Sequence, residues 1–168
     1  MVENGSTDLR IERVYRVLSE VCDPEIPVLS IEDLGIIRKV ELEESGVQVT
    51  ITPTYSGCPA MDSIESDILK ALQNAGYTQS KVLTVLDPPW TTEWMSETGK
   101  RKLEEYGISP PLRGTADKRS LFGAPPAVRC PHCKSQNTQV ISMFGSTACK
   151  ALYKCNDCQE PFDYFKCI

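Results

Sequence analysis

The residues of this chain best suited to chemistry are its eight cysteines, four of which form two Cys-x-x-Cys pairs near the end of the sequence. The pairs are Cys130 with Cys133 and Cys155 with Cys158, separated by 21 residues. Four thiolates in two such turns can surround one soft cation as a tetrahedron, which is the ligand set of a structural zinc site. We therefore expect a zinc ribbon with four cysteine ligands, with two disulfides as the alternative.

The redox state of the cellular compartment decides between a zinc site and disulfides. The first residues are polar and acidic and do not resemble a secretory signal, and no apolar run approaches the roughly 20 residues that span a bilayer. Disulfides are rare in reducing compartments, so we expect a cytoplasmic protein without a membrane partner, whose cysteines bind metal or act as thiols. Whether the ribbon holds zinc or iron stays open, because thiolates bind both.

Cys58 is a candidate reactive thiol, because it precedes Pro59 in a loop ahead of a predicted helix. Proline suits the first turn of a helix, so Cys58 is predicted to cap that helix. The helix dipole and the unpaired N–H groups of the first turn would then favour the thiolate and raise its metal affinity. The alternative is a partly buried cysteine that only packs at the helix start.

A short acidic loop, Asp23 to Pro27, is the second candidate, because its two prolines restrict the backbone. If this loop folds towards Cys58, Asp23 could hydrogen-bond the cap or share a metal with the thiol. The alternative is that Asp23 and Glu25 are solvated turn residues. Cys22, directly before the loop, is a further candidate neighbour of Cys58.

Two cysteines, Cys149 and Cys167, fall within the predicted ribbon but outside its paired turns. We predict that they pack as small apolar residues, with a share in a cluster site as the alternative.

The single histidine, His132, lies inside the first cysteine pair. Facial iron triads, His-Glu-x-x-His zinc sites, Rieske centres and di-iron bundles need more histidines than one. The sequence also contains neither a Gly-x-Gly-x-x-Gly nor a Walker lysine motif. We therefore expect a protein that is not an enzyme, and a metal site of three cysteines and His132 stays open.

The periodicity of apolar residues predicts an α-β-β-α-β-α order in the first part of the chain. Helices are expected where apolar residues recur every three or four positions, and strands where they alternate. The expected elements are a helix from Leu9 to Val21, a hairpin of 34–42 with 47–52, a helix from Met61 to Ala75, a strand from Lys81 to Leu86 and a helix from Thr91 to Tyr106.

Prolines and glycines from Ser109 onward predict a linker. We expect a small α+β domain over residues 1–108, a linker over 109–128 and the ribbon over 129–168. The ribbon has five Lys or Arg against three Asp or Glu, while the rest has 13 against 20. Because the ribbon's lysines are scattered, we expect no nucleic-acid partner.

Two features indicate protein partners. Trp90 follows two prolines and is predicted to be held out for contact with another protein. A three-stranded sheet also leaves exposed strand edges, which makes a homodimer a candidate assembly.

Three motifs give the first 108 residues a family resemblance. Asp23 to Ile26, Asp33 to Gly35, and Thr52 to Pro59 resemble the small domain of SufT-type iron-sulfur assembly proteins. The segment from Pro88 to Trp94, the cysteine pairs, Phe144 to Lys150 and the last eight residues resemble PaaD-like proteins of phenylacetate degradation. That second resemblance spans nearly the whole chain.

The resemblance implies that Cys58 is the family's reactive cysteine. It also implies a non-catalytic accessory factor of the phenylacetyl-CoA epoxidase system, which assists iron or iron-sulfur centre assembly in the oxygenase or its reductase. Those subunits would be its partners, and iron or a cluster would be bound only transiently. The alternative functions are a bridging subunit that handles no metal and a thiol reductase that uses Cys58, although no resolving cysteine pair lies in that domain.

Overall fold

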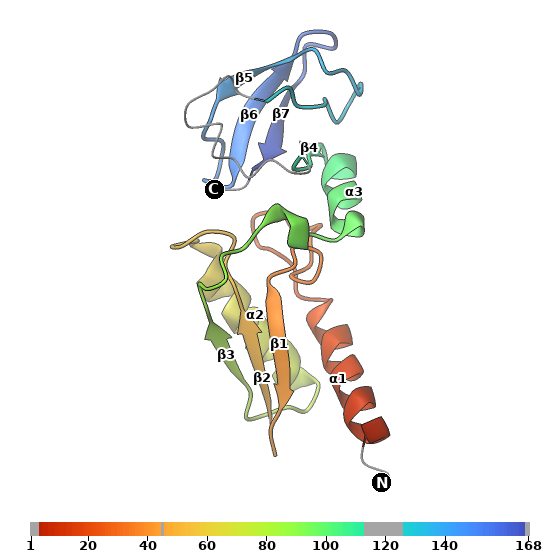
Figure 1. The fold of residues 1–168 in the computed structure, drawn as a ribbon, viewed down its shortest axis with the longest axis vertical. Coiled ribbons are helices and arrows are strands. Elements are labelled where there is room, and N and C mark those ends of the chain that lie inside the picture. The colour runs from red at the N-terminus through yellow and green to blue at the C-terminus, as the bar shows by residue number, and fades with distance from the viewer. Residues whose placement is uncertain (1–3, 45, 113–125, 167–168) are drawn as a thin grey trace. The chain divides into compact units, whose positions relative to one another are not determined.

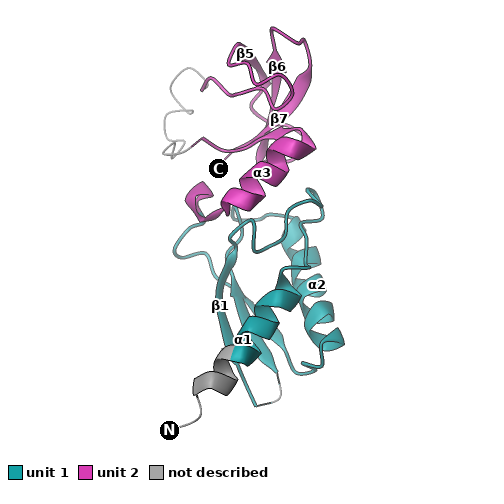
Figure 2. Ribbon diagram, turned by 90° about the vertical axis from the view of Figure 1, so that its right-hand side faces the viewer, with its two compact units in different colours: residues 1–90 teal, residues 91–168 magenta. Residues whose placement is uncertain are grey.

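The computed structural model describes residues 4–44, 46–112 and 126–166, with side chains described from residue 9 onward. The chain divides into two compact units, residues 1–90 and 91–168, which are coloured separately in Figure 2. The expected limits of the sequence domains, 1–108 and 129–168, remain a prediction. By its contacts, the helix nearest residue 108 belongs to the second unit.

The first unit is a three-stranded sheet with two helices on one side (Figures 1 and 2). Its central strand pairs antiparallel with the preceding strand and parallel with the following one, because a helix crosses over between the second and third strands. The predicted hairpin is thus confirmed. The elements are α1 (Asn4–Leu18), β1 (Ile37–Leu42), β2 (Val47–Ile51), α2 (Ala60–Asn74) and β3 (Lys81–Thr84).

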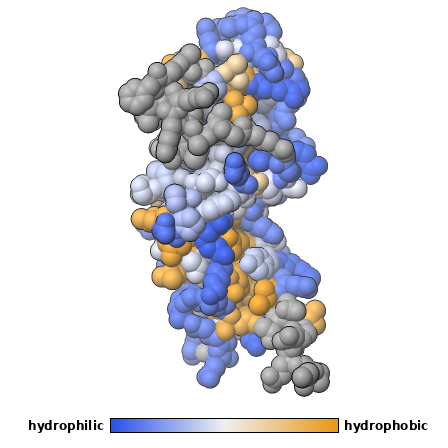
Figure 3. Space-filling model, in the orientation of Figure 1, coloured by the Kyte–Doolittle hydropathy of each residue, from blue (hydrophilic) through white to orange (hydrophobic). Residues whose placement is uncertain are grey.

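The core of the first unit lies between this sheet and the helices. Alternate β2 residues and helix residues at four-residue spacing are buried together: Val47, Val49 and Ile51 of β2, Val14 and Leu18 of α1, and Ile64, Ile68 and Leu72 of α2. The other face of the sheet is more open, with Leu83 49% and the nearby Leu86 60% exposed. Figure 3 shows hydrophobic surface over this unit, whereas the visible surface of the second unit is mostly hydrophilic.

Trp90 closes the first unit and is buried, so the prediction of an exposed partner contact is wrong. Its indole Nε1 donates a hydrogen bond of 2.9 Å to the backbone carbonyl of Leu34. A buried indole needs such an acceptor, and the loop before β1 supplies it from 56 residues away. The proline-rich segment therefore directs the ring into the core.

The second unit begins with two short helical elements and continues into a four-stranded sheet of order β4-β7-β6-β5. The third predicted helix starts later than expected: a 3-10 turn comes first, and Ser96 then caps the helix by accepting from the backbone N–H of Gly99. Gly107 ends the helix as predicted. The elements are η1 (Thr92–Trp94), α3 (Glu97–Tyr106), β4 (Ile108–Ser109), β5 (Thr138–Ser142), β6 (Lys150–Cys155) and β7 (Pro161–Phe165).

Aromatic residues of β6 and β7 form the core of this sheet. The Tyr153 ring lies 6.0 Å from that of Phe162 and 5.7 Å from that of Tyr164. Val128, at the end of the expected linker, is fully buried in the same core, while residues 113–125 lie outside the described residues. The core also contains two of the paired cysteines, so metal ligation and packing share the same small volume.

The packing predicted for the two ribbon cysteines outside the pairs can be checked for one of them. Cys149 is buried, and its Sγ lies 3.0 Å from the Oγ1 of Thr147, as expected for a packed thiol. Cys167 lies outside the described residues.

Candidate metal centre and cysteine loop

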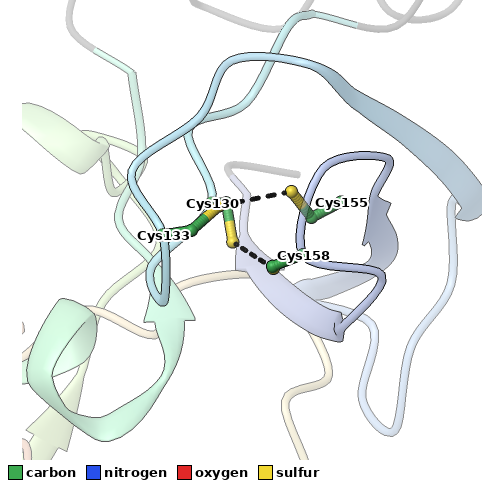
Figure 4. Close-up of side chains that lie close together, drawn as sticks. All are labelled: Cys130, Cys133, Cys155 and Cys158. Atoms are coloured by element: carbon green, nitrogen blue, oxygen red, sulfur yellow. Dashed lines mark hydrogen bonds between the residues drawn. The ribbon is translucent and has the colours of Figure 1, made fainter.

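Two turns of matching backbone present the four paired cysteines. In each turn the residue after the second cysteine, Lys134 or Gln159, has a left-handed φ of 66°. The first turn is closed by hydrogen bonds from Lys134 N to Cys130 O (3.0 Å) and from Cys130 N to Ser135 O (2.8 Å). Each turn folds back on itself, so its two sulfurs converge on the same side (Figure 4).

The four sulfurs face one another across the gap between the turns. The Sγ atoms of Cys130 and Cys158 are 3.8 Å apart, those of Cys133 and Cys155 are 3.5 Å apart, and all four lie within 4.8 Å of one another. A tetrahedral zinc ion with bonds of about 2.3 Å separates its sulfurs by about 3.8 Å. The donor set therefore fits one zinc ion. The separations are far too long for disulfides, and the seven described cysteines are free thiols.

Proton binding to these thiols shows how strongly they influence one another. The backbone N–H of Cys158, ahead of smaller contributions, lowers the pKa of Cys155 to about 7. Cys158 accepts from the backbone N–H of Glu160, but burial and the neighbouring thiols outweigh this and raise its pKa to about 12. Four adjacent sulfurs cannot all ionise unless a cation compensates their charge, so metal binding must release protons.

Polar residues outside the sulfurs fix the second turn. Asp157 accepts hydrogen bonds from the Ser135 hydroxyl and, at 2.7 Å, from the Asn137 side-chain amide, and both lower the pKa of this carboxyl. Asn156 N donates to Asn137 O at 2.8 Å. These bonds connect the second turn to the segment that follows the first, which holds the two cysteine pairs in register.

His132 is not part of the sulfur group. Among the described residues, the side chains that could jointly hold a metal are the four cysteines alone. His132 is exposed and lies near Gly107 at the end of α3. The group that could hold a metal therefore consists of the four cysteines, and His132 does not replace one of them in it.

The loop before α2 presents Cys58 differently from the prediction. The helix begins at Ala60, and its N-cap is Pro59, which has no side-chain cap bond. The thiol of Cys58 thus lies before the cap, in a turn where Cys58 N donates to Tyr55 O at 3.3 Å. Gly57 has a φ of 83°, a conformation that favours glycine, so the Gly-Cys-Pro order has a conformational reason.

The surroundings of this thiol do not favour the predicted activation. Burial is the largest effect and raises the pKa of Cys58, while the backbone N–H of Ala60 and the Tyr55 side chain lower it less. The charges of Glu25 and Asp23 raise it further. Cys58 therefore favours the protonated thiol when no cation is present.

The acidic loop thus lies near enough to Cys58 for its charges to act on the thiol. Asp23 Oδ1 accepts from the backbone N–H groups of Glu25 and Ile26, both at 2.8 Å, which folds the loop into a tight turn. Sequence reasoning singled out Asp23 and missed Glu25 and Tyr55 as neighbours of Cys58. Both lie in the same motifs, but their approach depends on how α1 and α2 pack.

Cys22 lies on the surface rather than in a cysteine pair. It is exposed, and its thiol is 3.8 Å from the carbonyl of Glu20. Its backbone forms an isolated antiparallel bridge with Ser30, which closes the acidic loop. The site roles expected for Cys58 and Asp23 stay predictions.

None of the helices in the described part of the chain has both the length and the apolar character that a bilayer crossing requires.

Comparison with known families matches each unit separately. Residues 11–83 match a family described as iron-sulfur cluster assembly protein, and residues 114–166 match one described as PaaD zinc beta ribbon domain. The crystal structure of a domain of unknown function, DUF59, from Bacillus anthracis has a TM-score of 0.51 and 34% identity, covering 55% of this chain and 89% of that one. The α+β fold with a C-terminal zinc ribbon is thus confirmed.

Two relatives share more than a fold. A Porphyromonas gingivalis protein named "Fe-S protein maturation auxiliary factor" is 37% identical over 94 residues, 55% of this chain and 89% of the relative. An Escherichia coli protein, named as the D component of a putative 1,2-phenylacetyl-CoA epoxidase, is 49% identical over 159 residues, 95% of this chain and 94% of the relative. The chain therefore belongs to the family of the phenylacetyl-CoA epoxidase D component, with an iron-sulfur assembly domain followed by a PaaD zinc ribbon.

Proposed function

We propose that this protein is a non-catalytic accessory factor of the phenylacetyl-CoA epoxidase system in phenylacetate catabolism. It assists the assembly of an iron or iron-sulfur centre in the oxygenase or its reductase. The observation that carries the proposal is the half-buried thiol of Cys58, placed within electrostatic reach of two carboxylates, in a domain of the iron-sulfur assembly type. The whole-length likeness to the E. coli protein supports the choice of system.

The electrostatics of this loop suit transient contact with a metal. The carboxylates of Asp23 and Glu25 disfavour the Cys58 thiolate and attract a cation. An arriving iron ion or cluster replaces the thiol proton, because its positive charge reverses the local balance. When the metal leaves, the thiol takes up a proton again. A thiol with these properties stays protonated and unreactive when no metal is bound, and it does not hold the metal permanently.

The ribbon supplies the second part of the proposed function. Its four cysteines fit one structural zinc ion, which stabilises the small core behind them. We assign the ribbon to recognition of the recipient subunit, and residues 1–108 to handling iron. Zinc then has a structural role, and the iron or cluster is cargo.

The test replaces Cys58 with serine and measures metal in the client. The oxygenase and reductase components are produced with the wild-type chain, with Cys58→Ser and with no chain, and iron and acid-labile sulfide are measured in each purified component. We expect one component to lose its metal without the chain and to lose most of it with Cys58→Ser. Zinc content and melting temperature of the variant should match the wild type.

The matched control is Cys22→Ser, which removes an exposed thiol beside the same acidic loop. This variant should support normal metal content in the client. If Cys58→Ser also supports it, the transfer role is wrong. A requirement for the chain without a requirement for Cys58 would instead favour a bridging subunit.

A further inference from the structure

Two hollows of opposite charge lie along the outer contact between α1 and α2. The first, of about 660 Å³, is bounded by the end of α1, the acidic loop and α2. Its charged lining residues are Glu20, Asp23 and Asp67, and its apolar lining includes Val17 and Ala71. The lining contains no Lys or Arg, but Lys70 beside it pairs with Asp67 at 3.0 Å. The negative charge of the hollow therefore rests mainly on Glu20 and Asp23, and the hollow fits a basic side chain with an apolar neighbour.

The second hollow, of about 520 Å³, is bounded by the beginning of α1 and the end of α2. Its charged lining residues are Arg10 and Arg13, and no acidic residue lines it. Beside them, Leu9 is 68% exposed. This end therefore offers what the first hollow fits, an exposed apolar side chain next to exposed cations.

The two hollows belong to one continuous surface. Ala75 lines both of them. Along α1, Arg10, Arg13 and Val17 follow one another at three- and four-residue spacing, which places them in one row on the helix. Glu20 continues this spacing in the turn directly after the helix. The row is basic at one end, apolar in the middle and acidic at the other end.

A surface of this kind is complementary to itself. A twofold rotation about an axis near the middle of α1 sets the basic end of each copy against the acidic end of the other, and both contacts form together. Because the twofold axis relates the two copies, each favourable charge contact occurs twice in the dimer. A partner with a single charge sign would match only half of the row.

We propose that a second copy of this chain occupies this surface, so that the protein forms a twofold dimer through antiparallel α1 helices. Leu9 and Arg10 of each copy enter the hollow lined by Glu20 and Asp23 of the other. Cys58, which belongs to the proposed iron-handling loop, does not line either hollow. The dimer does not depend on the proposed function.

The test uses charge reversal in the full-length, zinc-loaded chain under reducing conditions. Sedimentation equilibrium measures self-association of the wild type, of Arg10→Glu and of Glu20→Arg. Each variant alone places like charges at both contacts, so its dimer dissociation constant should rise at least about tenfold. An equimolar mixture of the two variants restores opposite charges at both contacts, and its association should return to near the wild-type level.

Lys39→Glu is the matched control, because it changes the net charge as Arg10→Glu does but lies on β1, away from both hollows. It should leave the dimer unchanged. A wild-type chain that stays monomeric at all concentrations overturns the proposal. So does an effect of Lys39→Glu equal to that of Arg10→Glu, or a mixture that fails to restore association while both variants melt like the wild type.

Discussion

The two units of this protein hold their cysteines in opposite ways. The first, residues 1–90, has 7 Lys or Arg against 15 Asp or Glu, and it places a single half-buried thiol near two carboxylates. The second, residues 91–168, has 11 against 8, and it brings four sulfurs together within 4.8 Å. A complete ligand set retains a metal, whereas one thiol in an acidic setting attracts a cation without enclosing it. The difference separates a structural site from a candidate transfer site.

The largest effect should follow from removing one ligand of the complete set. Cys155→Ser removes a fully buried sulfur that belongs both to the metal group and to the aromatic core. Structural zinc contributes about 10 to 16 kcal/mol to the folding of such sites, so the ribbon should lose zinc and unfold. Elemental analysis and the near-ultraviolet circular dichroism of the core tyrosines measure this.

The exposed cysteine Cys22 provides the control for that experiment. Cys22→Ser should retain the full zinc content and the tyrosine signal. If Cys155→Ser keeps both as well, the ribbon does not depend on its metal, and the contrast between the units fails.

An apolar core, rather than a metal, should stabilise the first unit. Trp90→Ala removes a buried ring and its hydrogen bond to Leu34, and should destabilise this unit by about 3 to 5 kcal/mol. Trp90→Phe keeps most of the ring but leaves the carbonyl without its donor, and should cost about 1 to 3 kcal/mol. Urea unfolding followed by circular dichroism gives both values, and zinc content should not change. An unaltered unfolding midpoint for Trp90→Ala would show that the ring is held out for a partner after all.

The sequence allowed prediction of features that depend on neighbouring residues and missed those that depend on distant ones. The element order and the cysteine pairs follow from local spacing, since a Cys-x-x-Cys turn needs little besides its own backbone. The setting of Trp90 depends on a carbonyl 56 residues away, and that of Cys58 on a loop from the other helix. Local spacing placed Cys58 at a helix cap and left the approach of Asp23 and the burial of the thiol as open alternatives, because neither follows from neighbouring residues. Long-range packing changed the sign of the expected pKa shift.

The thiol of Cys58 gives a smaller effect with a defined sign. The negative charge of Glu25 raises the pKa of Cys58, so Glu25→Gln should lower that pKa and increase the thiolate fraction at any pH below it. We expect alkylation of Cys58 at about pH 7.5 to become about two- to fivefold faster. The rate is followed across pH by mass spectrometry of the peptide that contains Cys58.

Glu65→Gln is the control for this measurement, because it removes the same charge from α2 and Glu65 is not among the groups that shift the pKa of Cys58. Its alkylation profile should overlay that of the wild type. If Glu25→Gln slows alkylation, the acidic loop acts on the thiol by something other than its charge.

The smallest effect should come from the backbone of the metal-binding turns. Gln159 has a φ of 66°, where a side chain costs roughly 1 kcal/mol that glycine avoids. Its exposed side-chain bond to the carbonyl of Asn156 returns little of this, because such bonds contribute weakly at the surface. Gln159→Gly should therefore raise the stability of the zinc-loaded ribbon by up to about 1 kcal/mol. Lys134 has the same φ, but its ammonium pairs with Glu104 at 2.7 Å, so Lys134→Gly should gain less or lose stability. Thermal unfolding of the two variants shows whether the cost of the left-handed backbone or the side-chain contact has the larger effect on stability in each turn. If Gln159→Gly is less stable than Lys134→Gly, the backbone cost is not the larger effect at Gln159.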